Sequence, residues 1–197
     1  MIAITDHGPS MAGVTGDLHF IMGPRMPKSE ITVLWGCEAN IVDENGELDL
    51  TERHIAALDI ILVGFHKTGY LDQGKEKNTQ VMEKVLKKPY VKVLTHPTHQ
   101  QFECDFERIV EAALENGVLP ELNLTYLREQ VDDFHLFKRL VEIVKAKNKK
   151  LIVNSDAHFV HEIGDDSILA KYWDRLGMSD DIVINNYPAE LKAFLEI

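Results

Sequence analysis

The sequence has few cysteines, no long apolar run and no glycine-rich phosphate-binding loop. Its two cysteines, Cys37 and Cys104, are too few for a disulfide framework and lack CxxC spacing, so we expect reduced thiols and a cytoplasmic protein. No segment approaches the roughly 18 apolar residues of a membrane span, and the chain does not start with a secretory leader, so we expect no membrane association. GxGxxG and GxxxxGKS/T patterns are missing, which excludes the usual nucleotide-binding folds.

Basic residues are also in the minority. The chain has 21 Lys and Arg against 32 Asp and Glu, a net charge of −11 with histidine neutral. This charge argues against binding to nucleic acid, although bound divalent cations can still attract a small anionic substrate. The length of 197 residues and the 45% hydrophobic content predict one globular domain covering residues 1–197.

Apolar runs with strand character alternate with helical patterns along most of the chain. Strands are expected at residues 1–5, 31–36, 58–65, 91–95, 118–124, 151–154 and 182–185, and helices at 76–88, 105–117, 132–147, 166–176 and 188–197. Such alternation indicates an α/β fold with a parallel sheet. The exceptions are an irregular loop at 9–30 and a small hairpin around Asn45-Gly46. Thr51 is expected to cap a helix in which His54 is solvated.

Polar residues recur where the strands end. The three apolar residues from Leu151 read as a short buried strand, and Asp156 and His158 stand just past its end, two residues apart. Earlier strands end near Glu38 or in a histidine. Five of the nine histidines lie at such ends: His7, His66, His96, His99 and His158. A barrel gathers the carboxyl ends of its strands around one mouth, so the pattern favours a TIM-like barrel over an open doubly wound sheet.

Imidazoles with a few carboxylates and no thiolates suit Zn²⁺, Mn²⁺ or Fe²⁺. A carboxylate such as Glu38 can bridge two ions, and clustered ions favour hydrolysis because they lower the pKa of bound water. These residues predict metal-assisted hydrolysis and leave open whether a phosphoester or an amide is cleaved.

Five ordered motifs, covering essentially the whole chain, resemble those of the PHP (polymerase and histidinol phosphatase) family, in particular its small stand-alone bacterial phosphatases of the YcdX type. The motifs are Ile4-Thr5-Asp6-His7-Gly8, Gly36-Cys37-Glu38-Ala39-Asn40, Gly64-Phe65-His66, Thr95-His96-Pro97 and Asn154-Ser155-Asp156-Ala157-His158. The resemblance implies a distorted (β/α)₇ barrel that holds up to three divalent metals, zinc foremost with manganese or iron as alternatives. It also implies hydrolysis of small phosphomonoesters by a metal-bound hydroxide.

The resemblance further assigns roles to particular residues. Glu38 would bridge two metals, one of them completed by His66 and His96 and the other served by Asp156. His7 and His158 would hold a third metal. Asp6 would orient a ligand imidazole from behind. The catalytic set implied is therefore Asp6, His7, Glu38 and Asp156, and the metal ligands are His7, Glu38, His66, His96, Asp156 and His158.

One family feature is missing. The family opens with a strand that carries His-X-His, whereas this sequence starts directly in the strand at 1–5. We therefore expect a barrel that lacks its first strand and helix, with impaired metal sites at Asp156 and at His7 and His158. An open barrel edge would expose apolar strand surface, so homo-oligomers can form.

Two other functions fit the same residues. An amidohydrolase-type enzyme shares the barrel and the ligands at strand ends, but it commonly adds a carbamylated lysine, and no lysine stands at such a position here. A degenerate barrel that binds metal without catalysis is the other alternative. Aryl phosphate tested against an amide or lactone would separate the two enzymes.

The sequence yields one direct mutational prediction. His96→Ala should abolish metal binding at the site of Glu38 and His66, because it removes a ligand, whereas His54→Ala should change neither metal content nor activity. Elemental mass spectrometry of the two purified variants makes the comparison, and equal effects would contradict the assignment.

Overall fold

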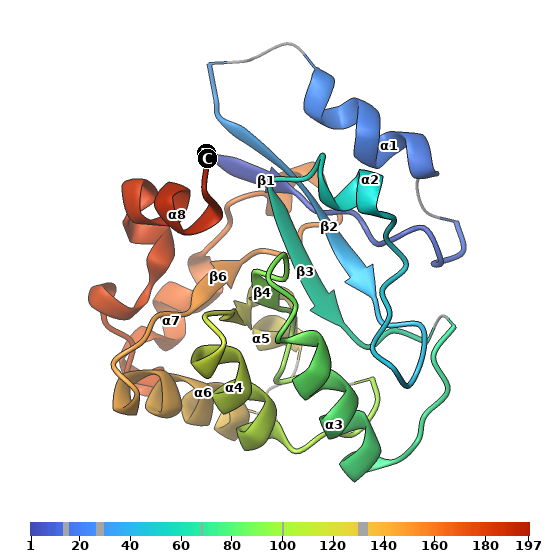
Figure 1. Cartoon of the computed structure of the whole chain (residues 1–197). Coiled ribbons are helices and arrows are strands. Elements are labelled where there is room, and N and C mark those ends of the chain that lie inside the picture. Colours follow the sequence, from blue (N-terminus) through green and yellow to red (C-terminus); the bar gives the residue numbers. More distant parts are fainter. Residues whose placement is uncertain (14–15, 27–29, 68, 100, 130–133) are drawn as a thin grey trace.

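The computed structural model describes residues 1–13, 16–26, 30–67, 69–99, 101–129 and 134–197. In this part of the chain, six parallel strands form one sheet in sequence order, and the sheet curls into an open half-barrel (Figure 1). The strands are β1 (Ile2–Ile4), β2 (Val33–Asn40), β3 (Ile60–Gly64), β4 (Val93–Leu94), β5 (Leu119–Asn123) and β6 (Ile152–Asn154). The predicted α/β class with a parallel sheet is therefore correct.

The helices connect the strands and cover the sheet (Figure 1). They are α1 (Asp17–Met22), α2 (Glu52–Ile55), α3 (Lys75–Val85), α4 (Phe106–Glu115), α5 (Leu124–Glu129), α6 (Phe134–Ala146), α7 (Ser167–Leu176) and α8 (Pro188–Leu195). Short 3-10 turns are η1 (Gly23–Arg25), η2 (Val160–Glu162), η3 (Asp180–Ile182) and η4 (Ile184–Asn186). Apolar faces of α3 and α4 pack on one side of the central strands, and α6 and α7 extend this layer beside β5.

Alternation along the strands divides the sheet into two faces. In β3, Ile61 and Val63 join the core formed with α3 and α4, whereas Ile60 and Leu62 face the concave side. There they join a second core with apolar residues of the neighbouring strands and with α8: Leu34, Val93, Leu119, Ile152, Ile184, Leu191 and Leu195. This apolar layer fills the amino-terminal half of the concave face and leaves the carboxyl ends of the strands to polar side chains.

The predicted seven-stranded TIM-like barrel is wrong. The run at 182–185 lies in η3 and η4 instead of a strand. Among the described residues it pairs with the sheet through a single bridge, between Leu151 and Val183. The Asn185 carboxamide supplies the hydrogen bonds that a neighbouring strand would otherwise supply. Its Oδ1 accepts from Val153 N and its Nδ2 donates to Val153 O, both at 2.8 Å. The side chain thereby satisfies the outer edge of β6, and the sheet ends there.

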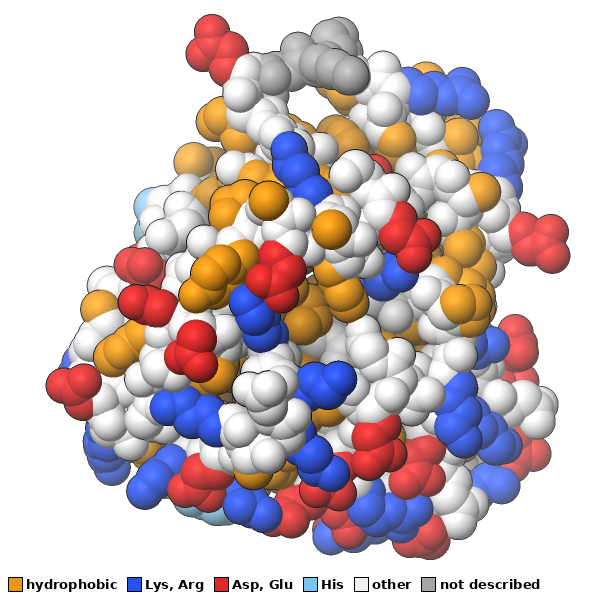
Figure 2. Space-filling view, turned by 60° about the vertical axis from the view of Figure 1, so that its left-hand side comes forward, with side chains coloured by type: hydrophobic (Ala, Val, Ile, Leu, Met, Phe, Trp, Pro, Cys, Tyr) orange, Lys and Arg blue, Asp and Glu red, His pale blue; other side chains and the backbone are white. Residues whose placement is uncertain are grey.

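The opposite edge is β1, which pairs with β2. Met1 and Ile2 are 45% and 37% exposed, so this edge does present apolar surface. In the view of Figure 2, apolar side chains gather in the upper part of the molecule, and acidic and basic side chains are interspersed over the lower part. Self-association through the edge stays a prediction.

One local expectation is corrected and another is confirmed. The segment 9–30, expected to be irregular, contains α1 and η1 among its described residues, and Phe20 and Ile21 anchor α1 in the core. The expected hairpin is present as an antiparallel bridge between Ile41 and Leu48. No helix in the described ranges is long and apolar enough to cross a membrane.

His54 is buried, against the expectation of a solvated helix residue. Thr51 caps α2 as predicted, because its side chain accepts from His54 N at 3.3 Å. The His54 imidazole completes the cap, since its Nδ1 accepts from Thr51 N at 3.3 Å, and the ring lies 5.8 Å from that of Phe20. The side chain is 2% exposed, so His54 supports the fold.

This burial gives His54→Ala a different expected effect from the one the sequence suggested. Loss of the hydrogen bond from Thr51 N to the imidazole and of the packed ring should lower the free energy of unfolding by about 1–3 kcal/mol. Urea unfolding of the two variants tests this, with His135→Ala as the control because His135 is exposed on α6. A wild-type unfolding midpoint for His54→Ala would contradict the capping role.

Both cysteines are buried, and neither is in a disulfide bond. Burial raises the pKa of Cys104 to about 12 and raises that of Cys37 as well, so neither forms appreciable thiolate at pH 8. Iodoacetamide at pH 8 should therefore leave the native protein unmodified and alkylate both thiols in denaturant, as measured by intact mass. Rapid modification of the native protein would show that the core opens around a thiol.

Candidate metal centre

The candidate site is built on Glu38, near the end of β2. Its register partner on β3 is Leu62, whose side chain faces the concave core, so the Glu38 carboxylate enters the concave side just above the apolar layer. Glu38 is 8% exposed. A carboxylate in such a place needs charged or hydrogen-bonding partners.

Two of these partners come from the next strands. His66 follows β3 and His96 follows β4, and the Nε2 atom of each lies 3.1 Å from Glu38 Oε1. The two Nε2 atoms lie 3.2 Å from one another. His66 is 1% exposed and His96 6%. The carboxylate oxygen and two imidazole nitrogens thus form a compact triangle of potential ligand atoms.

His7 approaches Glu38 from the other side, on the turn that follows β1. Backbone bonds on either side of His7 hold the turn against β2: Glu38 N donates to Asp6 O at 3.0 Å, and Gly8 N donates to Glu38 O at 2.9 Å. His7 Nδ1 lies 3.6 Å from Glu38 Oε2, and its ring meets the His66 ring edge-on at 4.6 Å. His7, Glu38 and His66 each offer a ligand atom within 4.8 Å of the others.

Electrostatics favour an ionised Glu38. Burial opposes ionisation, but the hydrogen bonds to His66 and His96 outweigh it and hold the pKa of Glu38 well below its usual range. Burial likewise opposes a charged His96, yet its hydrogen bond to Glu38 leaves its pKa raised. The pKa of His7 is lowered, chiefly by burial, so His7 favours the neutral form that binds metals.

The geometry of this cluster fits a divalent ion. Ligand atoms at 2.0–2.1 Å from a tetrahedral zinc lie roughly 3.3 Å apart, close to the spacing of the triangle formed by Glu38, His66 and His96. The buried Nδ1 of His7 has no hydrogen-bond partner. Imidazole nitrogens and carboxylate oxygens that lie close together while one of them lacks a hydrogen-bond partner are typical of metal ligands.

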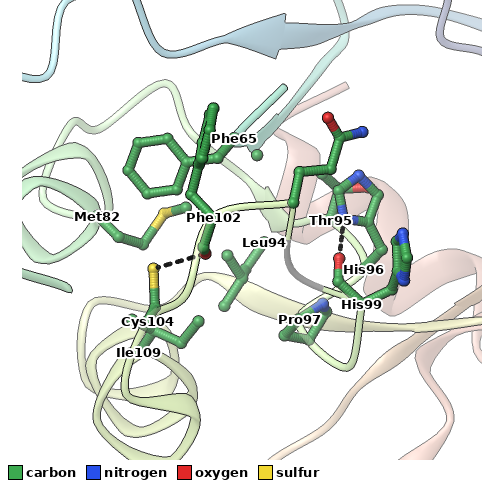
Figure 3. Close-up of a pocket in the computed structure, with 12 residues that line it drawn as sticks. Phe65, Met82, Leu94, Thr95, His96, Pro97, His99, Phe102, Cys104 and Ile109 are labelled. Atoms are coloured by element: carbon green, nitrogen blue, oxygen red, sulfur yellow. Dashed lines mark hydrogen bonds between the residues drawn. The ribbon is translucent and has the colours of Figure 1, made fainter. Parts of the chain in front are cut away.

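A hydrogen bond at Nδ1 fixes the orientation of the His96 ring. His96 Nδ1 lies 3.1 Å from His99 O (Figure 3), and a carbonyl can only accept, so Nδ1 carries the proton. Nε2 is then directed at Glu38. The His99 ring stacks on Tyr126 at 3.9 Å, and Tyr126 meets the His96 ring edge-on at 5.5 Å. A histidine that ligates a metal commonly donates its other N–H in this way.

Beside His96 lies a small recess, shown in Figure 3. Its lining is largely apolar and includes Phe65, Met82, Leu94, Phe102, Cys104 and Ile109. The cavity measures about 20 Å³, enough for one water molecule. The recess therefore shields His96 and is too small to hold a substrate.

A second layer of polar groups supports the cluster, and Glu121 on β5 is its centre. Glu121 is 2% exposed and accepts from His96 N at 2.7 Å and from Asn154 Nδ2 at 2.7 Å. The Thr95 hydroxyl lies 3.0 Å from both Glu121 and Glu38 and donates to one of them at a time. Burial raises the pKa of Glu121. Sequence reasoning did not place Glu121 in the site, although a carboxylate inside the apolar run 118–124 was a usable signal.

Asp156 and His158 lie farther out. Asp156 Oδ2 accepts from Asn123 Nδ2 at 3.1 Å, and its charge acts on both His7 and His96. The His158 side chain is 65% exposed, with Nδ1 3.0 Å from Asp156 O. The structure thus brings His7, Glu38, His66 and His96 together, with Asp156 beside them and His158 at the surface.

Asp6 lies beside His19, which is not among the predicted metal ligands. Its Oδ2 lies 2.8 Å from Nε2 of His19 on α1, and the His19 ring packs against Phe20 and Trp35. Asp6 therefore fastens α1 to the turn after β1. Its assigned role behind a ligand imidazole stays a prediction, as do the metal roles of the other site residues.

The comparison with family models found no match. Among curated proteins, the chain is similar to a probable phosphatase of Tolumonas auensis, at 34% identity over 100% of this chain and 81% of the relative. A probable phosphatase of Acetivibrio thermocellus is 34% identical over 94% of this chain and 78% of the relative, and one of Shewanella halifaxensis is 30% identical over 99% and 80%. Full-length similarity at this level shows common descent, and the chain belongs to the family of these probable phosphatases.

Proposed function

We propose that this protein is a metal-dependent phosphoesterase of the PHP type that hydrolyses small phosphomonoesters. The observation that carries the proposal is the meeting of three imidazoles with one buried carboxylate at the carboxyl ends of neighbouring strands. The names of the relatives, probable phosphatases, supply the reaction. A small phosphorylated compound is the proposed substrate.

Glu38, His66 and His96 would hold the first ion, with zinc the best match to two imidazoles and a carboxylate and manganese or iron as alternatives. Such an ion polarises the phosphoryl group and lowers the pKa of water when bound. His7 and Asp156 would contribute to further ions beside the first, and His158 would join them if its exposed side chain turned inward. Up to three ions are proposed.

The other proposed roles belong to Glu38, to the two buried histidines and to Asp156. Glu38 faces both His7 and the pair of His66 and His96, one oxygen toward each side, which suits a bridging carboxylate. Burial of His66 and His96 excludes water from the inner side of the site. Asp156 is half-buried at the outer side of the site and keeps access to solvent, so it would meet a substrate that enters there.

The two alternative functions have less support. An amidohydrolase-type reaction has the same ligands at strand ends, but the relatives are named as phosphatases. A degenerate metal-binding barrel would keep the ligand triangle and lack turnover. Assays with an aryl phosphate and with an amide distinguish all three.

Glu38→Gln tests the proposal directly. The substitution keeps the shape of the side chain and removes the charge that the three imidazoles share, so we expect metal content to fall below one equivalent and aryl phosphate hydrolysis to drop by at least about 100-fold. Metal content is measured by elemental mass spectrometry. Aryl phosphate hydrolysis is measured after chelation and again after metal is restored.

Glu47→Gln is the matched control, because Glu47 is exposed and pairs with Lys88 at 3.7 Å on the surface. It should behave as wild type. Full activity of Glu38→Gln, or wild-type activity that persists in chelator, would exclude the proposed function. A metal-loaded wild-type protein that is inert on phosphate esters would favour the degenerate barrel.

A further inference from the structure

Asp49, just after the hairpin bridge at Leu48, takes part in a dense polar network beside the site. Its Oδ1 accepts from Asn40 N at 2.8 Å. Its Oδ2 accepts from Asn40 Nδ2 at 2.6 Å, from Ser10 N at 3.0 Å and from Ser10 Oγ at 2.8 Å. The carboxylate therefore joins the end of β2 to the turn that follows β1.

This turn is the one that carries His7. Asn40 Nδ2 also donates to Gly8 O at 3.3 Å, so the network reaches the residue next to His7 through the side chain that Asp49 orients. Gly8 packs directly on Asp49: a Cβ atom at Gly8 would lie 2.3 Å from Asp49 Oδ1. Close packing and hydrogen bonds together define where the turn lies.

The His7 imidazole has little to hold it in place by itself. Its Nδ1 stands 3.6 Å from Glu38 Oε2 and has no hydrogen-bond partner. β1, the strand before it, is a three-residue edge strand whose first two residues are exposed. The position of the imidazole therefore depends on the backbone of residues 6–10.

We propose that Asp49 is a positioning residue that holds the His7 turn in register with Glu38, so that the His7 imidazole is preorganised for a divalent ion. It acts through Asn40, Gly8 and Ser10 and does not touch the ion or the substrate. The consequence for metal binding rests on the proposed function, whereas the positioning of the turn can be measured without any metal.

Asp49→Asn is the test variant, because it replaces an acceptor oxygen by an amide that cannot accept from all of these donors. Asp43→Asn is the matched control. Asp43 lies in the same hairpin and accepts from the backbone N–H groups of Asn45 and Glu47, both at 2.9 Å, away from the His7 turn. Ser10→Ala removes one bond of the network and serves if Asp49→Asn is poorly folded.

The first measurement is amide hydrogen exchange in chelator-treated protein. Asp49→Asn should speed exchange at Gly8 and Ser10 by about 10-fold or more, and Ser10→Ala should do so more weakly. Asp43→Asn should leave these two amides unchanged. Unchanged protection of Gly8 and Ser10 in Asp49→Asn would overturn the proposal.

The second measurement is zinc affinity by competition with a chromogenic chelator. Asp49→Asn should bind zinc about 10–100-fold more weakly than wild type, while its metal-free unfolding midpoint shifts no more than that of Asp43→Asn. Wild-type zinc affinity in Asp49→Asn would overturn the preorganisation. A wild-type protein that binds no zinc would instead refute the proposed function, and the exchange data would still decide the positioning of the turn.

Discussion

The buried carboxylate of Glu38 is the group on which the surrounding structure depends. An isolated ionised carboxylate buried against an apolar layer would cost more free energy than the whole fold has in reserve, so partners must reach it. The partners are imidazoles that follow β1, β3 and β4, on both sides of the strand that carries Glu38. Only a parallel sheet delivers these strand ends to one place, and curling of the sheet turns them toward the same point. The fold and the chemistry of the site therefore both require a parallel sheet that curls.

Strand alternation explains why the polar layer is as well defined as it is. In β5, the residues that face the concave side change from apolar to polar along the strand, since Leu119 belongs to the core and Glu121 to the polar layer. α8 covers the apolar half and leaves the polar half accessible. A shift of one residue in any strand would exchange the two faces, so the apolar floor fixes the register that the ligands need. Packing at one end of the strands thus sets ligand geometry at the other.

Much of this could be predicted from the sequence, because strands and the residues just beyond them are local features. The six strands and the long helices follow from periodicity, and Glu38, His66 and His96 follow from their places at strand ends. The failures have long-range causes. The seventh strand is replaced by turns because the Asn185 side chain already satisfies β6. His54 looked solvated because neither its reciprocal bond with Thr51 nor its packing against Phe20 has a periodic signature. Glu121 was overlooked because its partners, Thr95, His96 and Asn154, come from other strands.

The proposed metal ligands also differ in how the structure holds them, and the open sheet explains the difference. His66 and His96 follow interior strands, where neighbours on both sides and the core beneath fix the backbone. His7 follows the edge strand β1, which pairs on one side and buries little of its own surface. A histidine that follows an edge strand has little hydrophobic packing around it, so its position depends on polar contacts. Asp49, in the loop after the hairpin, supplies them directly to Ser10 and, through Asn40 at the end of β2, to Gly8. Asn40 and Asp49 are more than thirty positions from His7 in the sequence, which is why the motif at residues 4–8 predicts His7 as a ligand and gives no sign of the contacts that support it.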